Sequence, residues 1–283
     1  MGISSTVAKE NDRSIQINFT IPQSLIESEI DKLVEKESKE LEVPGFRKGK
    51  APKHIVRKNL SEDKLLSQAL SNILPNAFYS VIKEHNIKVV MYPKFEVVGK
   101  KDSVIEVKAV TCEAPEIQLG DYKDLIRNSK KADIWVPGKD RTKKEPTREQ
   151  KESQVIRILL EKYKDIQVPR VLLEEEVNIK LSALLSRLEK LGLTLEGYLQ
   201  SIGKTAESLR NEYLESVKSS IILDFILSEI ALKEDIKIDS SEAKEFFKSV
   251  NPEVVDKPEE KQLTGIIQIL KKRKALEKLS SLL

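Results

Sequence analysis

The 283-residue sequence has few of the residues that build turn-rich or pocketed proteins. Its 10 glycines and 11 prolines together make up about 7% of the chain where about 12% is usual, which disfavours a sheet-and-turn protein. Only 14 side chains are aromatic (1 Trp, 6 Tyr and 7 Phe), so few residues are available to line a large aromatic ligand pocket. These shortages favour long helices.

Cysteine and long apolar runs are also nearly absent. The single cysteine, Cys112, excludes an internal disulfide, and the alternating apolar residues around it predict a buried strand position rather than a nucleophile. The longest apolar stretch is interrupted by Asp224, so no segment can cross a bilayer core of about 30 Å. We therefore expect a cytoplasmic protein without a membrane segment.

The sequence offers no recognisable catalytic or cofactor site. His54 and His85 are the only imidazoles, and no cysteine or carboxylate repeats around them at metal-ligand spacing. Gly203-Lys204-Thr205 resembles the end of a phosphate loop, but the preceding Gly197 is one position too far away, so we expect a loop in which Thr205 caps the next helix. No serine elbow accompanies a histidine. No cofactor and no metal are therefore expected.

Charged residues are abundant: they make up 34% of the chain, against a usual value of about 25%. The sequence has 49 Lys and Arg residues against 46 Asp and Glu residues. The resulting net charge of +3 does not by itself indicate a particular kind of binding partner. Apolar residues make up 39% of the chain, which is enough for a hydrophobic core and predicts a large solvent-exposed surface. The length predicts about two domains.

The first 113 residues predict a small α+β domain. Apolar and polar residues alternate over 14–21, which predicts a strand, and Ser24 with Glu27 then predicts a capping box at the start of a helix running to about residue 41. Apolar pairs recur every four residues over 65–82, which predicts a second long helix. The β-branched runs at 87–98 and 104–112 predict a hairpin that returns to the first strand.

The remainder predicts a linker and an all-helical domain. Residues 114–150 contain three prolines, two glycines and a charged run without sustained periodicity, so we assign them to a linker. From residue 152 the helical period dominates, with breaks expected at Val168-Pro169 and at Gly192. The predicted domains are 1–113, the linker 114–150, and 151–283. Periodicity is the same for apolar residues in the core and on the surface, so it identifies no residue of the helical domain that would contact another protein.

The most informative segment is the loop at 44–53 with the short helix after it. The stretch from Val43 to Leu60 contains no acidic residue, and Phe46 stands there among cations without an apolar neighbour in its own loop. Such an aromatic side chain either packs against the neighbouring helices or is exposed and available to a binding partner. Six cations lie within twelve residues: Arg47, Lys48, Lys50, Lys53, Arg57 and Lys58.

Residues 45–52, GFRKGKAP, match the G-F-R-x-G-x-x-P signature of the trigger factor family, the bacterial ribosome-associated chaperones, at every fixed position. The stretches 113–125 and 153–177, Ile221–Ile238 and the terminal ILKKRKALEKL are similar to the family as well. The resemblance covers about 1–125 and 151–283. It implies an α+β ribosome-binding domain followed by an elongated all-helical domain with arms.

The resemblance also implies partners and site residues. Phe46, Arg47 and Lys48 would dock on ribosomal protein and RNA beside the polypeptide exit tunnel, and the helical domain would hold nascent unfolded chains without ATP. Gly45, Gly49 and Pro52 would shape the loop, since glycine permits positive φ and proline stiffens the exit. Auxiliary basic contacts would come from Lys50, Lys53, Arg57 and Lys58.

Full-length members carry an FKBP-like prolyl isomerase domain between the two matched regions. Only residues 126–150 are available here, too few for a five-stranded aromatic pocket, so we expect no isomerase activity and interpret Trp135 as a packing anchor. Two alternatives stay open: an RNA-binding or ribosome-assembly factor using residues 47–58 and 139–151, and a prolyl isomerase. No membrane partner is expected, and weak homodimerisation is left open.

Overall fold

The computed structural model of the chain describes residues 4–39, 46, 49, 52–101, 103–129, 146–250 and 260–283, without the side chains of Lys53 and Lys261. The chain divides into two compact units. The first comprises Met1–Ala114 with Pro169–Leu172, and the second Pro115–Val168 with Leu173–Leu283. The first unit is α+β and the described part of the second is helical, which confirms the predicted fold class.

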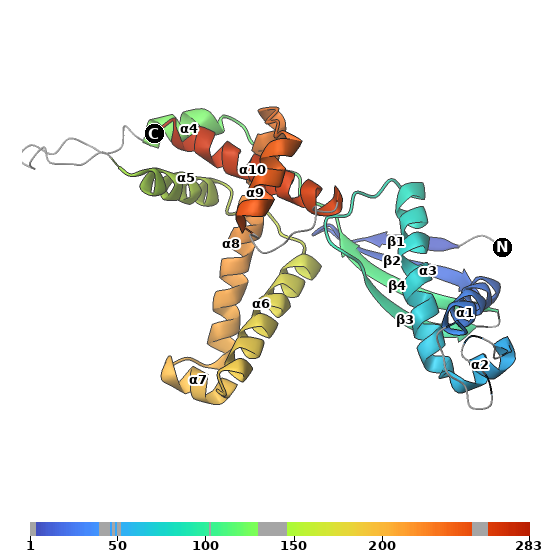
Figure 1. Cartoon of the computed structure of the whole chain (residues 1–283). Coiled ribbons are helices and arrows are strands. Elements are labelled where there is room, and N and C mark those ends of the chain that lie inside the picture. Colours follow the sequence, from blue (N-terminus) through green and yellow to red (C-terminus); the bar gives the residue numbers. More distant parts are fainter. Residues whose placement is uncertain are drawn as a thin grey trace, which may run out of the picture. The chain divides into compact units, whose positions relative to one another are not determined.

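A four-stranded antiparallel sheet forms the centre of the first unit (Figure 1). Its strands, in the spatial order β1-β2-β4-β3, are β1 (Ser5–Lys9), β2 (Ser14–Pro22), β3 (Lys94–Lys101) and β4 (Val104–Cys112). The predicted first strand and its pairing with the second arm of the hairpin are confirmed, because β2 pairs with β4 over its whole length. The run that begins at Ile87 becomes a strand only at Lys94, just after Pro93. Strand β1, at one edge of the sheet, was not predicted.

The core of the first unit lies between this sheet and its helices. The helices are α1 (Gln23–Glu37), α2 (Lys53–Asn59) and α3 (Glu62–Glu84). Residues 15, 17, 19 and 21 of β2 are buried while 16, 18 and 20 are not, so the period of two places one face of the strand in the core. In α3 the apolar pairs 69/70, 73/74 and 77/78 are all buried, which confirms the predicted helical stripe.

The start of α1 differs from the prediction. The helix begins at Gln23, with Pro22 as its N-cap and no side-chain cap, so the expected Ser24–Glu27 capping box is wrong. Pro22 already has the extended φ and ψ that the cap position needs, and its ring leaves no N–H to be satisfied there. Glu27 instead accepts hydrogen bonds from Gln23 and from Arg57 of α2.

The second unit consists of seven helices within the described residues. They are α4 (Tyr122–Ser129), α5 (Arg148–Lys162), α6 (Arg170–Lys190, whose first three residues group with the first unit), α7 (Leu195–Ser201), α8 (Ala206–Lys233), α9 (Ser240–Val250) and α10 (Glu260–Ser280). The predicted breaks at Val168-Pro169 and at Gly192 are confirmed. The main core joins side chains of α4, α5, α8 and α10.

The segment assigned to a linker contributes to this core. Leu119, Tyr122 and Ile126 are buried there, and the Tyr163 hydroxyl of α5 donates a hydrogen bond of 2.5 Å to the Leu119 carbonyl. Eight residues of α4 are too short a window for a clear helical period, so the sequence did not reveal this helix. Trp135 lies outside the described residues.

Cys112 is fully buried at the end of β4, which confirms the strand position predicted for it. Burial, together with the negative charge of Asp12, raises the pKa of the Cys112 thiol to about 11. Because the thiolate is the reactive form, this cysteine is inert at neutral pH.

The Gly203-Lys204-Thr205 segment ends one helix and begins the next. Gly203 has a φ of +64°, and the Lys204 N–H donates to the carbonyl of Leu199, which closes α7. The Thr205 hydroxyl accepts from the N–H of Ser208 at 3.1 Å and caps α8, as predicted. Helix capping therefore accounts for all three residues.

Candidate functional site

The predicted docking residues fall in the sequence segment 44–53, which follows α1 in the chain and ends at the first residue of α2; we call this segment the docking loop. Phe46, Gly49, Pro52 and the backbone of Lys53 belong to the described residues. Four of the predicted residues, Gly45, Arg47, Lys48 and Lys50, lie outside them.

Phe46 leaves 41% of its surface exposed, so it is not tucked fully into the core. Gly49 has a φ of +76°, a left-handed conformation that a residue with a side chain would adopt only with strain. A Cβ at this position would also lie 3.4 Å from the Lys39 carbonyl oxygen. Pro52 is the N-cap of α2, and its carbonyl accepts from the N–H groups of Ile55 and Val56. The described part of the loop thus has the backbone shapes expected for its glycine and proline.

Helix α2 is held against the first unit by apolar and polar contacts, Ile55 among the apolar ones. Val56 is fully buried in the core, while the Arg57 guanidinium donates to the Glu27 carboxylate of α1 at 3.0 Å. Asp31, one turn further along α1, lies 3.9 Å from the same guanidinium. The hydrogen bond from Arg57 lowers the pKa of Glu27, since it stabilises the charged carboxylate.

Not all cations of this segment are therefore equally available to a partner. Arg57 is paired with acids of α1, while Lys58 is exposed on the same short helix. The Val43–Leu60 segment has no acid of its own, and the acids that neutralise Arg57 come from about 30 residues earlier in the chain. Sequence spacing could not show this pairing.

A second candidate surface lies on α6, α7 and the turn between them. Figure 1 shows α6 and α8 as two long helices that converge on α7. Six large apolar side chains in this stretch are at least 36% exposed: Ile179, Leu185, Leu191, Leu193, Leu195 and Ile202. We call these six residues the arm surface. A group of exposed apolar side chains of this kind is typical of a surface that binds another apolar chain.

The turn at Gly192 ends α6 between two of these leucines, Leu191 and Leu193. The Leu193 N–H donates to the Leu188 carbonyl and the Gly192 N–H to that of Glu189, the two bonds of a Schellman motif, with Gly192 at a φ of +68°. Leu191 and Leu193 therefore lie on either side of a tight turn, beyond the row of apolar side chains along α6. Their exposure depends on how the chain leaves α6, which the spacing of apolar residues in the sequence does not predict.

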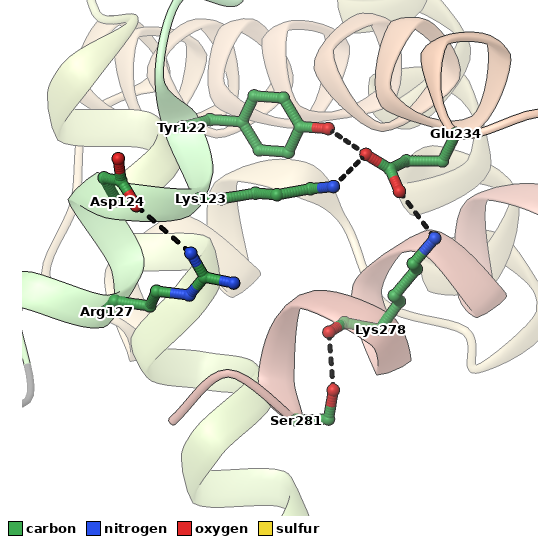
Figure 2. Close-up of polar contacts among 7 residues, drawn as sticks. All are labelled: Tyr122, Lys123, Asp124, Arg127, Glu234, Lys278 and Ser281. Atoms are coloured by element: carbon green, nitrogen blue, oxygen red, sulfur yellow. Dashed lines mark hydrogen bonds and ion pairs between the residues drawn. The ribbon is translucent and has the colours of Figure 1, made fainter.

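The polar centre of the second unit is Glu234, at the end of α8. Its carboxylate accepts a hydrogen bond of 2.6 Å from the Tyr122 hydroxyl and contacts the ammonium groups of Lys123 and Lys278, each at 2.5 Å (Figure 2). Lys233 places its ammonium 5.1 Å from the centre of the Tyr122 ring. Three separate helices, α4, α8 and α10, thus meet at one carboxylate.

These contacts fix the charge state of the carboxylate. The hydrogen bonds from Lys123, Lys278 and Tyr122 lower the pKa of Glu234 to about 2, because each stabilises the anion. Burial, followed by the hydrogen bond to Glu234, raises the pKa of Tyr122. Both groups therefore keep their protonation states at neutral pH. The cluster fastens α4 to the body of the unit, which is a structural role.

The basic run of α10 is also largely neutralised within the unit. Lys272 pairs with Asp224 of α8, and Lys274 contacts Glu242 of α9 at 2.7 Å. Arg148 of α5, which the RNA-binding alternative would use, bonds to Glu152 and to Glu277. Cations engaged in this way offer less to a phosphate backbone.

Among the residues described, no three His, Cys, Asp or Glu side chains gather where they could hold a metal ion. Within the same ranges, none of the helices combines the length and apolar character that crossing a membrane requires.

Comparison with protein families identifies both parts of the chain. The family described as bacterial trigger factor protein matches residues 3–136, and its C-terminal part matches residues 139–281. The trigger factor of Streptococcus gordonii is 41% identical over 120 residues, and that of Streptococcus pneumoniae strain Hungary19A-6 is 40% identical over 120 residues. Each alignment covers 41% of this chain and 27% of the relative, so the matched part is about a quarter of the relative's length.

A solved structure has the same fold over nearly the whole chain. It comes from work on promiscuous substrate recognition in the folding and assembly activities of the trigger factor chaperone. The two structures superpose with a TM-score of 0.58 over 98% of this chain and 99% of the other, at 15% sequence identity. The solved structure thus shows the fold, and the two family matches show that the chain belongs to the trigger factor family.

Proposed function

We propose that the protein is an ATP-independent chaperone that docks on the ribosome near the tunnel exit through Phe46, Arg47 and Lys48. There it holds nascent or unfolded chains on the arm surface, in the cytoplasm. Family membership and the exposed Phe46 support the docking part of the proposal. The observation that carries the holding part is the set of six exposed apolar side chains between residues 179 and 202.

Holding requires no chemistry at this surface. Unfolded segments would bind by removing apolar area from water, which contributes roughly 25 cal/mol per Å². The turn and the short helix α7 present leucine side chains outside any helical core stripe, so segments of many sequences could make contact there. Binding of this type is weak, broad and reversible. It suits a protein that must release its client to fold.

The proposed role includes no prolyl isomerase activity. The two family matches end and begin at residues 136 and 139, so only residues 137 and 138 lie between them. Full-length members of the family carry their isomerase domain between the two matched regions, and two residues are too few to form such a domain. We therefore propose a holding function alone.

Wild-type protein is expected to suppress the aggregation of an unfolded model protein without ATP. Replacing Leu185, Leu191 and Leu193 together with serine should raise the concentration needed for half-suppression about tenfold, corresponding to about 1.4 kcal/mol of lost apolar contact. All three side chains are exposed, so the fold should tolerate the change. Light scattering during dilution of the unfolded client measures the effect.

The matched control replaces three exposed apolar residues of the same unit outside the arm surface, Leu232, Val250 and Ile269, with serine. This variant should suppress aggregation as wild type does. If both variants lose suppression equally, general surface hydrophobicity is responsible and the arm surface is not the client site.

A further inference from the structure

We propose that Glu27 and Arg57 are positioning residues of the docking loop, an ion pair that fixes α2 against α1 and thereby sets where the loop is held. The proposal deepens the proposed function and rests on it. It gives Arg57 a different role from the one expected from sequence, where it was an auxiliary basic contact.

The contact geometry shows that Arg57 is directed at α1. Its Nη2 donates to Glu27 Oε2 at 3.0 Å, and its Nη1 lies 3.9 Å from Asp31 Oδ1. Glu27 and Asp31 are four residues apart on α1, so they share one helix face and both lie within reach of the forked guanidinium. The second Glu27 oxygen accepts from Gln23 at 3.3 Å, which orients the carboxylate.

The position of this pair in the chain gives it a role in docking. The chain leaves α1 after Glu37 and enters α2 at Lys53, so the docking loop is anchored by these two helices. With seven residues, α2 is too short to be stable alone and depends on tertiary contacts for its orientation. Val56, with Ile55 and Leu60 beside it, packs α2 on the core, and the Arg57–Glu27 bond adds a contact from α2 to α1.

Positioning and direct contact predict opposite effects of removing the Glu27 charge. If Arg57 bound a ribosomal phosphate or carboxylate itself, Glu27→Gln would free its guanidinium and remove a competing negative charge, so ribosome affinity would rise or stay constant. If the pair positions the loop, Glu27→Gln and Arg57→Gln break the same contact. Both changes should then weaken binding to a similar extent.

The experiment measures the affinity of labelled full-length protein for empty ribosomes at several salt concentrations. We expect Glu27→Gln and Arg57→Gln each to weaken binding roughly two- to fivefold, as for a partly exposed ion pair. The double change Glu27→Gln with Arg57→Gln should weaken binding no more than either single change, because both remove the same contact. The slope of log affinity against log salt should stay that of wild type, because no contact with a phosphate is removed.

The matched control is Glu29→Gln, on the same helix, whose carboxylate contacts Lys32 of α1 and Asn72 of α3, each at 3.1 Å. It should bind ribosomes as wild type does. Binding by Glu27→Gln as tight as wild type or tighter, or a double variant whose loss is the sum of the two single losses, would overturn the positioning role. So would a salt slope shallower by about one in Arg57→Gln.

Failure of this inference can be told from failure of the docking proposal. If Phe46, Arg47 and Lys48 can be replaced by alanine without loss of binding, the docking loop itself is wrongly assigned. If that triple change abolishes ribosome binding while Glu27→Gln does not weaken it, the docking proposal stands and only the positioning role of Glu27 and Arg57 is wrong.

Discussion

Replacing Phe46, Arg47 and Lys48 together with alanine is expected to lower the affinity for ribosomes by at least about tenfold. Phe46 is an exposed aromatic, and aromatic anchors with neighbouring cations carry much of the binding energy of interfaces. The two cations would form charge-assisted hydrogen bonds with RNA phosphates or acidic side chains. Co-sedimentation with ribosomes at low and moderate salt measures the loss.

The control for this variant replaces one exposed aromatic and two exposed lysines elsewhere in the first unit. Tyr92, Lys83 and Lys88, which lie in or after the last turn of α3 and before the edge strand β3, are exposed and fit this purpose. Their replacement by alanine removes the same types of side chain and should leave pelleting unchanged. Equal pelleting of the docking-loop variant and wild type would show that this loop does not dock the protein.

Glu234→Gln is expected to destabilise the second unit by about 2 kcal/mol at neutral pH, since it weakens hydrogen bonds to a charged group. The Glu234 side chain is only 11% exposed and contacts Tyr122, Lys123 and Lys278, so its loss leaves two ammonium groups without their shared partner. Hydrogen exchange of amides in α4, α8 and α10 measures the change in this unit separately from the first.

The effect of Glu234→Gln should depend on pH. The pKa of Glu234 is lowered from an ordinary value of 4.5 to about 2, so its contribution is fully present above pH 4.5 and is lost as the pH falls toward 2. Wild type and variant should therefore converge in stability between pH 4.5 and pH 2. A constant difference across this range would mean that shape, and not charge, explains the destabilisation.

Glu242→Gln is the matched control for the Glu234 experiment. Glu242 also pairs with a lysine of α10, Lys274 at 2.7 Å, but both side chains are about 40% exposed. An exposed pair of this kind contributes about 0–1 kcal/mol. The control should therefore change exchange rates much less than Glu234→Gln.

Local periodicity was sufficient to predict the main elements of the fold. The alternation in β2 and the four-residue spacing in α3 are repeated many times within one segment, and one face of each is buried. Five-residue β1 and eight-residue α4 were not predicted, because segments this short contain too few repeats. Their formation depends on pairing with β2 and on packing in the second core.

The candidate site was predicted only as far as its motif allowed. The signature pointed to residues 45–52, whose docking role stays a prediction, and the positive φ of Gly49 agrees with the reason given for that glycine. The pairing of Arg57 with Glu27 joins residues 30 positions apart, and the exposure of Leu191 and Leu193 depends on how α6 ends. Both follow from tertiary structure, which composition and spacing do not encode directly.

The most direct test of the account places a photoreactive amino acid at Leu193, in the arm surface, and irradiates the protein on ribosomes that carry a nascent chain. The account predicts an adduct with the nascent chain, formed without ATP. It predicts that the adduct decreases at least about tenfold when Phe46, Arg47 and Lys48 are alanine, in line with the loss of docking. Absence of a nascent-chain adduct, or an adduct equally strong without the docking residues, would contradict it.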